Sequence, residues 1–131
     1  MAEYLEGTEQ QKSRAYSPAV ITEGGRIVWL AGQTALADKD GQDIAGNFEA
    51  QARRVFELMD QTLRRAGGAL ANLVTMTVFI KEPRHGDRFV ELRRHFFPDG
   101  KFPGSALITV SNCARPGIEI EIQGIGVVGS K

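Results

Sequence analysis

The chain has 131 residues, the usual size of one domain. Its 16 Lys and Arg residues balance 16 Asp and Glu residues, so the formal net charge is zero. Proteins that bind nucleic acid by neutralising its phosphates normally carry a basic surplus, so no nucleic-acid partner is expected. No stretch approaches the roughly 18 apolar residues of a membrane span, so no membrane partner is expected either.

Cysteine usage and the start of the chain bear on the compartment. Cys113 is the single cysteine, which excludes an internal disulfide and fits a reducing environment. Residues 1–14 are polar and lack the basic start and apolar run of a signal peptide. We therefore expect a cytoplasmic protein in which residues 1–131 form one domain and residues 1–14 are loosely ordered.

The first predicted elements are two strands. Residues Ala15–Ile21 suit the edge of a sheet, because Pro18 interrupts them. Residues Arg26–Gln33 are rich in β-branched and aromatic side chains, which favours a strand. The turn residues Glu23–Gly25 lie between the two segments, so we expect a β-hairpin.

A long amphipathic helix is predicted next. Asn47 is a good N-cap, and Gly67 and Gly68 supply the left-handed cap that ends the helix. Between them, apolar residues recur at steps of three and four, which draws one buried stripe along a helix. The stripe consists of Phe48, Ala52, Val55, Phe56, Met59, Leu63 and Ala66.

The second half of the chain predicts three more strands and a second helix. Asn72–Lys81 alternates with period two, as a central strand does. Asp87 is expected to cap a helix with Phe89, Leu92 and Phe96 on its buried stripe. Ser105–Ser111 and Ile118–Val128 are the last strands. The order ββαβαββ predicts an α+β fold, with two helices packed on one face of a mixed sheet.

Two helices leave the other sheet face uncovered. Leu73, Phe79, Leu107 and one of Trp29 or Leu30 are expected on that face, which is too apolar to leave in water. Burial against further copies of the chain solves this, so we expect a homo-oligomer. Clefts between its subunits are natural sites for a small-molecule ligand.

Few residues suggest a metal or cofactor. His85 and His95 lie ten residues apart without a Cys or carboxylate at metal-ligand spacing, so no metal is expected. Cys113 has no nucleophile motif around it and is expected to be a small buried thiol. Ala31-Gly32-Gln33 lacks the further glycines of a phosphate-binding loop, so neither a nucleotide nor another cofactor is expected.

The last strand contributes acidic residues to the uncovered face. Alternation from Ile118 to Gln123 directs three isoleucines into the core and Glu119, Glu121 and Gln123 to the opposite face. A carboxylate in a cleft between subunits can serve as an acid/base group. The alternative is a solvated polar stripe, and the pattern favours neither.

Several short motifs, in their order and spacing from Tyr16 to Val127, resemble the Rid family, also called YjgF-like, RutC-like or L-PSP proteins. The resemblance implies a chorismate-mutase-like fold and a homotrimer with a pocket at each subunit interface. For the best-known branch, it also implies hydrolysis of reactive enamines and imines to keto acids and ammonia. The motifs are Ala31-Gly32-Gln33, Gln51-Ala52-Arg53, Ala66-Gly67, Val78-Phe79-Ile80-Lys81, Phe96-Phe97, Phe102-Pro103 and Ile118-Glu119-Ile120-Glu121.

The resemblance also implies roles for particular residues. Glu119 matches the family acid that orients or activates water, Tyr16 matches the pocket tyrosine, and Gly32 matches the glycine of the pocket floor. Leu107 stands where the family has a small residue or a cysteine. Val90 and Arg93 stand where its second helix has an asparagine and a tyrosine.

One position departs from the deaminase branch of the family. That branch has an arginine two residues after the Phe-Pro pair, which grips the substrate carboxylate, whereas this chain has Ser105. The loss is expected to alter the choice of substrate. Either Arg115, in the turn before the last strand, supplies the cation from another direction, or the substrate lacks a carboxylate. The alternative is that Arg115 is an exposed residue of the turn with no role in binding.

Three functions remain open from the sequence. The first is a Rid-type hydrolase of an enamine, imine or related reactive metabolite, with Glu119 as acid/base, Ser105 as a hydrogen-bonding group and Tyr16 shaping the pocket. The second is a non-catalytic, ligand-binding or regulatory homotrimer, which the missing arginine favours. The third is an endoribonuclease or translation inhibitor, the weakest because the chain has zero net charge.

Overall fold

The structure, a computed structural model, describes residues 2–129. Its main sheet is mixed, because its central pair of strands, β4 and β6, is antiparallel whereas β4 and β5 run parallel. The four strands lie in the order β3 (Arg26–Trp29), β6 (Ile120–Val128), β4 (Leu73–Ile80) and β5 (Gly104–Thr109).

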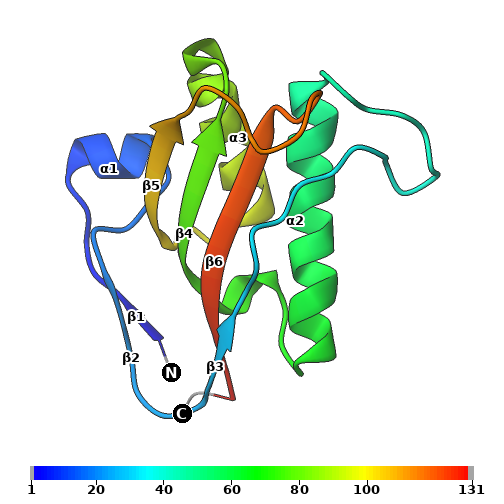
Figure 1. The fold of residues 1–131 in the computed structure, drawn as a ribbon. Helices are drawn as coiled ribbons and strands as arrows, with labels where there is room; N and C mark the ends of the chain where they lie inside the picture. Colours follow the sequence, from blue (N-terminus) through cyan, green and yellow to red (C-terminus); the bar gives the residue numbers. More distant parts are fainter. Residues whose placement is uncertain (1, 130–131) are drawn as a thin grey trace.

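Two helices, α2 (Phe48–Arg65) and α3 (Gly86–Phe96), share one hydrophobic core with this sheet. They lie on the same side of it, and in the described chain no helix covers the other face (Figure 1). Two short 3-10 turns, Leu70–Asn72 and Pro83–His85, lead into β4 and α3. The α+β architecture predicted from the sequence is confirmed.

Helix α2 forms as its local sequence predicts. The Asn47 side chain accepts a hydrogen bond of 3.0 Å from the backbone N–H of Ala50. Gly67 adopts a φ of +90°, the left-handed conformation that ends the helix. Helix α3 begins at Gly86 after His85, so Asp87 lies in its first turn rather than at its N-cap.

The N-terminal region is more regular than expected. Strand β1 (Ala2–Tyr4) pairs with β2 (Val20–Thr22) in a separate two-stranded antiparallel sheet. Helix α1 (Glu9–Ser13) begins with a capping box between Thr8 and Gln11. Regular elements therefore occur where residues 1–14 were expected to be loosely ordered.

The predicted hairpin between the first two strands is wrong. β2 pairs with β1, whereas β3 pairs with the last strand, β6. The sequence shows that two strands flank a glycine turn, but the strands to which they bond come from distant parts of the chain.

The predicted face is also wrong for two residues. A bulge between Leu73 and Thr75 turns Leu73 into the core, and Leu107 pairs with Val78, which faces the helices. Leu30 is buried, whereas Trp29 is 73% exposed. Phe79 alternates with Val78 and lies on the open face, as predicted.

The uncovered sheet face, hereafter the open face, is nevertheless apolar. Its exposed large side chains are Ile27, Trp29 and Ile108. A hollow of about 310 Å³ lies beside Trp29, between Thr75, Thr77 and Gln123. Within residues 2–129 no helix combines the length and the apolar character needed to cross a bilayer.

Candidate functional site

The predicted site residues fall into two groups and one outlier. Gly32, Glu119 and Glu121 form the acidic cluster. Tyr16 and Ser105 lie beside Arg93 in the arginine cluster, and Leu107 follows Ser105 on the same face of β5. Arg115 belongs to neither: it is exposed on the turn before β6, and its backbone N–H donates a 2.8 Å hydrogen bond to the carbonyl of Cys113.

Glu119 is held at the start of β6 from two sides. Its backbone N–H donates to Oε1 of the buried Gln51 at 2.8 Å. Its carboxylate lies 3.9 Å from Nζ of Lys81, and its side chain is 13% exposed. Gln51 also donates to the carbonyl oxygens of Ile44 and Gly117, at 2.9 and 2.7 Å. Gln51 therefore fixes the backbone from which the acidic cluster projects.

Glu121 is the carboxylate that touches Gly32. A bridge between Gln33 and Ile122 brings the two segments together, and a Cβ at position 32 would overlap the Glu121 carboxylate. Burial raises the pKa of the nearby Cys113 thiol, and Glu121 and Glu119 raise it further. Both carboxylates thus act on one small region, but the glycine is in contact with Glu121 and not with the predicted Glu119.

The arginine cluster lies where β5 meets α3 and the segment after α1. Nη1 of Arg93 donates to the Ser105 hydroxyl at 2.5 Å, and Nη2 donates to the carbonyl of Arg14 at 2.9 Å. The guanidinium carbon lies 6.0 Å from the centre of the Tyr16 ring. A cation is therefore present beside Ser105, and it comes from α3 rather than from Arg115.

The family resemblance assigns no role to Arg93, because the family has a tyrosine at this position. Its one available signal is its spacing: Arg93 follows Phe89 by four residues, which puts a charge next to the apolar stripe of α3. In the structure Arg93 is only 2% exposed. Burial lowers its pKa to about 10, and the nearby Arg14 adds to that effect.

The two clusters lie on opposite faces of the sheet. Ser105 pairs with Met76, whose side chain is in the core beneath the helices. Glu121 pairs with Phe79, which has the opposite alternation and faces the open side. Within one copy, the acidic cluster and the arginine cluster therefore cannot contact one molecule of small ligand together.

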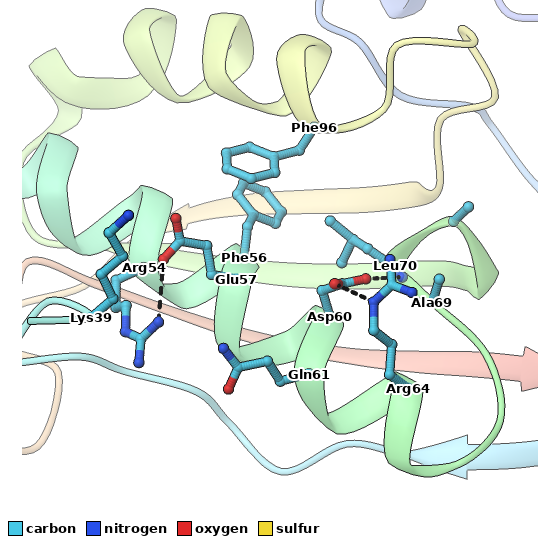
Figure 2. A pocket seen from close by; sticks show the side chains of 11 residues that line it. Lys39, Arg54, Phe56, Glu57, Asp60, Gln61, Arg64, Ala69, Leu70 and Phe96 are labelled. Carbon is cyan, nitrogen blue, oxygen red and sulfur yellow. Dashed lines mark hydrogen bonds and ion pairs between the residues drawn. The ribbon is translucent and has the colours of Figure 1, made fainter.

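A separate hollow of about 510 Å³ lies over the outer side of α2 (Figure 2). Figure 2 shows Phe56 and Phe96 stacked at its apolar floor, with ring centroids 4.8 Å apart. Four of its five charged lining side chains pair with each other, Arg54 with Glu57 and Arg64 with Asp60. No predicted site residue lines it.

The histidines lie outside both clusters. His85 stacks on Phe48 with ring centroids 4.3 Å apart, and His95 makes an edge contact with Phe96. Across residues 2–129, no three His, Cys, Asp or Glu side chains gather so that they could hold a metal ion.

The mixed sheet with two helices on one face defines a chorismate-mutase-like α+β protein. Residues 8–128 match the model of the family described as Endoribonuclease L-PSP. The chain belongs to this family, the Rid/YjgF/L-PSP proteins.

Individual relatives agree with this family assignment. The chain is 28% identical over 110 residues to a RutC family protein of Pyrococcus horikoshii, covering 84% of each chain. It is 31% identical over 112 residues to Protein DfrA of Myxococcus xanthus, covering 86% of this chain and 84% of that one.

Solved structures show the same fold. The Rid family protein YyfB from Yersinia pestis superposes with a TM-score of 0.85 at 21% identity, covering 97% of this chain and 98% of that one. A structure titled a putative endoribonuclease, from Thermotoga maritima, gives a TM-score of 0.68 at 30% identity, covering 86% and 85%.

Proposed function

We propose that this chain is a Rid-type hydrolase of a small enamine, imine or related reactive metabolite. The observation that carries the proposal is the acidic cluster, in which a carboxylate lies against a glycine on an open sheet face. Family membership supports this class of activity. We keep the cytoplasm as its compartment, because the single cysteine fits a reducing environment.

The proposed working unit is a homotrimer. Ile27, Trp29 and Ile108 form an exposed apolar surface that burial against further copies would remove from water. Because the two clusters face opposite sides of the sheet, one site needs the acidic cluster of one copy and the arginine cluster of its neighbour. The proposed site is therefore composite, and an isolated copy holds two incomplete halves.

The proposed acid/base group is Glu121. The prediction from sequence resemblance was Glu119, but Glu121 is the acid beside Gly32, and Glu119 lies next to the Lys81 amine. Because Gly32 has no side chain, the Glu121 carboxylate can lie directly against its backbone. Tyr16, Ser105 and Leu107 shape the neighbouring half, and Arg115 has no role in the proposal.

The proposed reaction consumes one water. An enamine first becomes its imine tautomer, and water then adds to the imine carbon while Glu121 accepts a proton from the water. Glu121 returns that proton to the nitrogen, which gives a carbinolamine. It then carries the hydroxyl proton of the carbinolamine to the same nitrogen, the carbon–nitrogen bond breaks, and ammonia leaves as the carbon becomes a carbonyl. Water supplies the oxygen, and no electrons are gained or lost.

The test measures keto acid formation from an imine generated in place by an amino-acid oxidase or lyase. Wild type should accelerate hydrolysis, and Glu121→Gln should lower the rate by about a hundredfold or more. Glu119→Gln is the matched control and should keep at least a third of the rate. Equal rates for wild type and Glu121→Gln would remove the proposed role, and no turnover by wild type would favour a non-catalytic ligand-binding trimer.

A further inference from the structure

Arg93 carries a buried charge that no acid of the described chain neutralises. Among residues 2–129, the arginines that form an ion pair with a carboxylate are Arg14, Arg53, Arg54, Arg64 and Arg88. Within this range Arg93 forms none, and the other arginines without an ion pair are exposed to solvent. Yet Arg93 is the most enclosed of them, at 2% exposure. Burying an unpaired cation is costly, so such a residue calls for a compensating anion.

The contacts of the guanidinium are all neutral. Ser105 and the carbonyl of Arg14 accept from its two terminal nitrogens. Its Nε is buried and has no acceptor within the described residues. The rings of Phe89 and Tyr16 flank the group, with its central carbon 5.0 and 6.0 Å from their centres. The planar fork is thus held in one orientation with a donor unused.

The surroundings favour an anion over any other ligand. The Arg14 guanidinium lies at the rim, its side chain 35% exposed and its Nη1 2.6 Å from Asp87. Burial lowers the pKa of Arg93, and like-charge repulsion from Arg14 adds to that effect. Ser105 and Tyr16, which adjoin the guanidinium, are both half-buried, so the arginine cluster is not sealed from solvent. A planar carboxylate matches the fork of an arginine and would neutralise the unpaired charge of Arg93.

We propose that Arg93 binds the carboxylate of the ligand, reached past Ser105 and Tyr16, and that the ligand is a small monocarboxylic acid. This inference rests on the proposed function only in taking the arginine cluster as one half of the substrate site. It sets the substrate class: the imine or enamine carries a carboxylate although Ser105 has no charge.

The alternative is a purely structural Arg93 that holds the carbonyl end of α1. Arg94 provides a matched control for that role, because its Nη2 donates to the carbonyl of Ser13 at 2.8 Å and it is exposed to solvent. If holding the segment were the only task, replacing either arginine would loosen the same segment and neither would affect anion binding.

The experiment compares 2-oxobutanoate with its uncharged methyl ester, using calorimetric titration of the whole protein. Wild type and Arg94→Gln should bind the acid and not the ester. Arg93→Gln should bind the acid about tenfold to a hundredfold more weakly. Equal affinity in Arg93→Gln, equal binding of acid and ester by wild type, or a loss confined to Arg115→Gln would each overturn the proposal.

A second variant covers the case in which Arg93→Gln does not fold. Arg93→Lys keeps the charge but loses the planar fork, so it should fold and bind the acid about tenfold more weakly. Unchanged affinity in Arg93→Lys would overturn the proposal. Because binding is measured without turnover, Arg93-dependent binding in a protein that hydrolyses nothing would overturn the proposed hydrolysis alone.

Discussion

Replacing Gln51 by leucine should destabilise the protein strongly. Gln51 is completely buried and makes three hydrogen bonds: to the carbonyls of Ile44 and Gly117, and from the backbone N–H of Glu119. Leucine keeps most of the volume but removes all three bonds: the Glu119 N–H is left without an acceptor, while the two carbonyls each keep one backbone donor. At roughly 1 kcal/mol for each lost bond, the free energy of unfolding should fall by about 3 kcal/mol.

Urea denaturation measures this loss. With a slope of about 1–3 kcal/mol per molar urea, the midpoint should fall by about 1–3 M. The control is Gln61→Leu, an exposed position on the same helix, which should change the free energy by less than about 0.5 kcal/mol. All variants are compared at one protein concentration, since association adds to stability. A loss below about 1 kcal/mol in Gln51→Leu would refute the view that this side chain clamps the start of β6.

Three further changes test other parts of the structure. Trp29→Asp places a charge on the open face and should give a monomer by light scattering; an unchanged oligomer mass would contradict burial of that face. Gly117→Ala should cost more than about 1 kcal/mol in urea unfolding, because φ is +86° and the added Cβ would lie 2.9 Å from the Cβ of Ala45. Hydrogen bonds from Arg88 lower the pKa of Glu49 to about 2, so the stability that this carboxylate contributes should be present above about pH 4.5 and lost toward pH 2. Glu49→Gln should reduce this loss of unfolding free energy between about pH 4.5 and pH 2. The reduction should be less than about 1 kcal/mol, because the Glu49 side chain is 41% exposed. An unchanged pH profile would count against the ion pair.

Elements with local signals could be predicted from the sequence. Helix α2 has a cap at Asn47, an apolar stripe and a glycine stop, and each is a property of neighbouring residues. The partner of a strand is not such a property. The chain around the Glu23–Gly25 turn resembles a hairpin, but β2 and β3 bond to distant strands.

The bulge before Thr75 shows a second limit. Strict alternation assigns Leu73 to the open face, but one irregular residue reverses the side on which a side chain lies. No single residue type marks that bulge in the sequence.

In the candidate site, too, the sequence predicts local features but not contacts between distant segments. Alternation is a local property, and it groups Glu119 with Glu121; in the structure both carboxylates act on the Cys113 thiol. The choice between them depends on which carboxylate meets Gly32, and that follows from a bridge between segments nearly ninety residues apart. Likewise, Arg93 and Ser105 lie on different elements, and only the packing of α3 against β5 brings a cation to the serine.

Mixing two defective variants tests most directly whether the site is shared between copies. Glu121→Gln removes the acidic half and Arg93→Gln removes the arginine half, so each alone should hydrolyse the imine poorly. In mixed oligomers formed by refolding the two together, roughly a quarter of the interfaces should carry both intact halves, restoring about a quarter of the wild-type rate. Activity no higher than that of the separate variants, in mixed oligomers verified by native mass spectrometry, would contradict a site assembled between neighbouring copies.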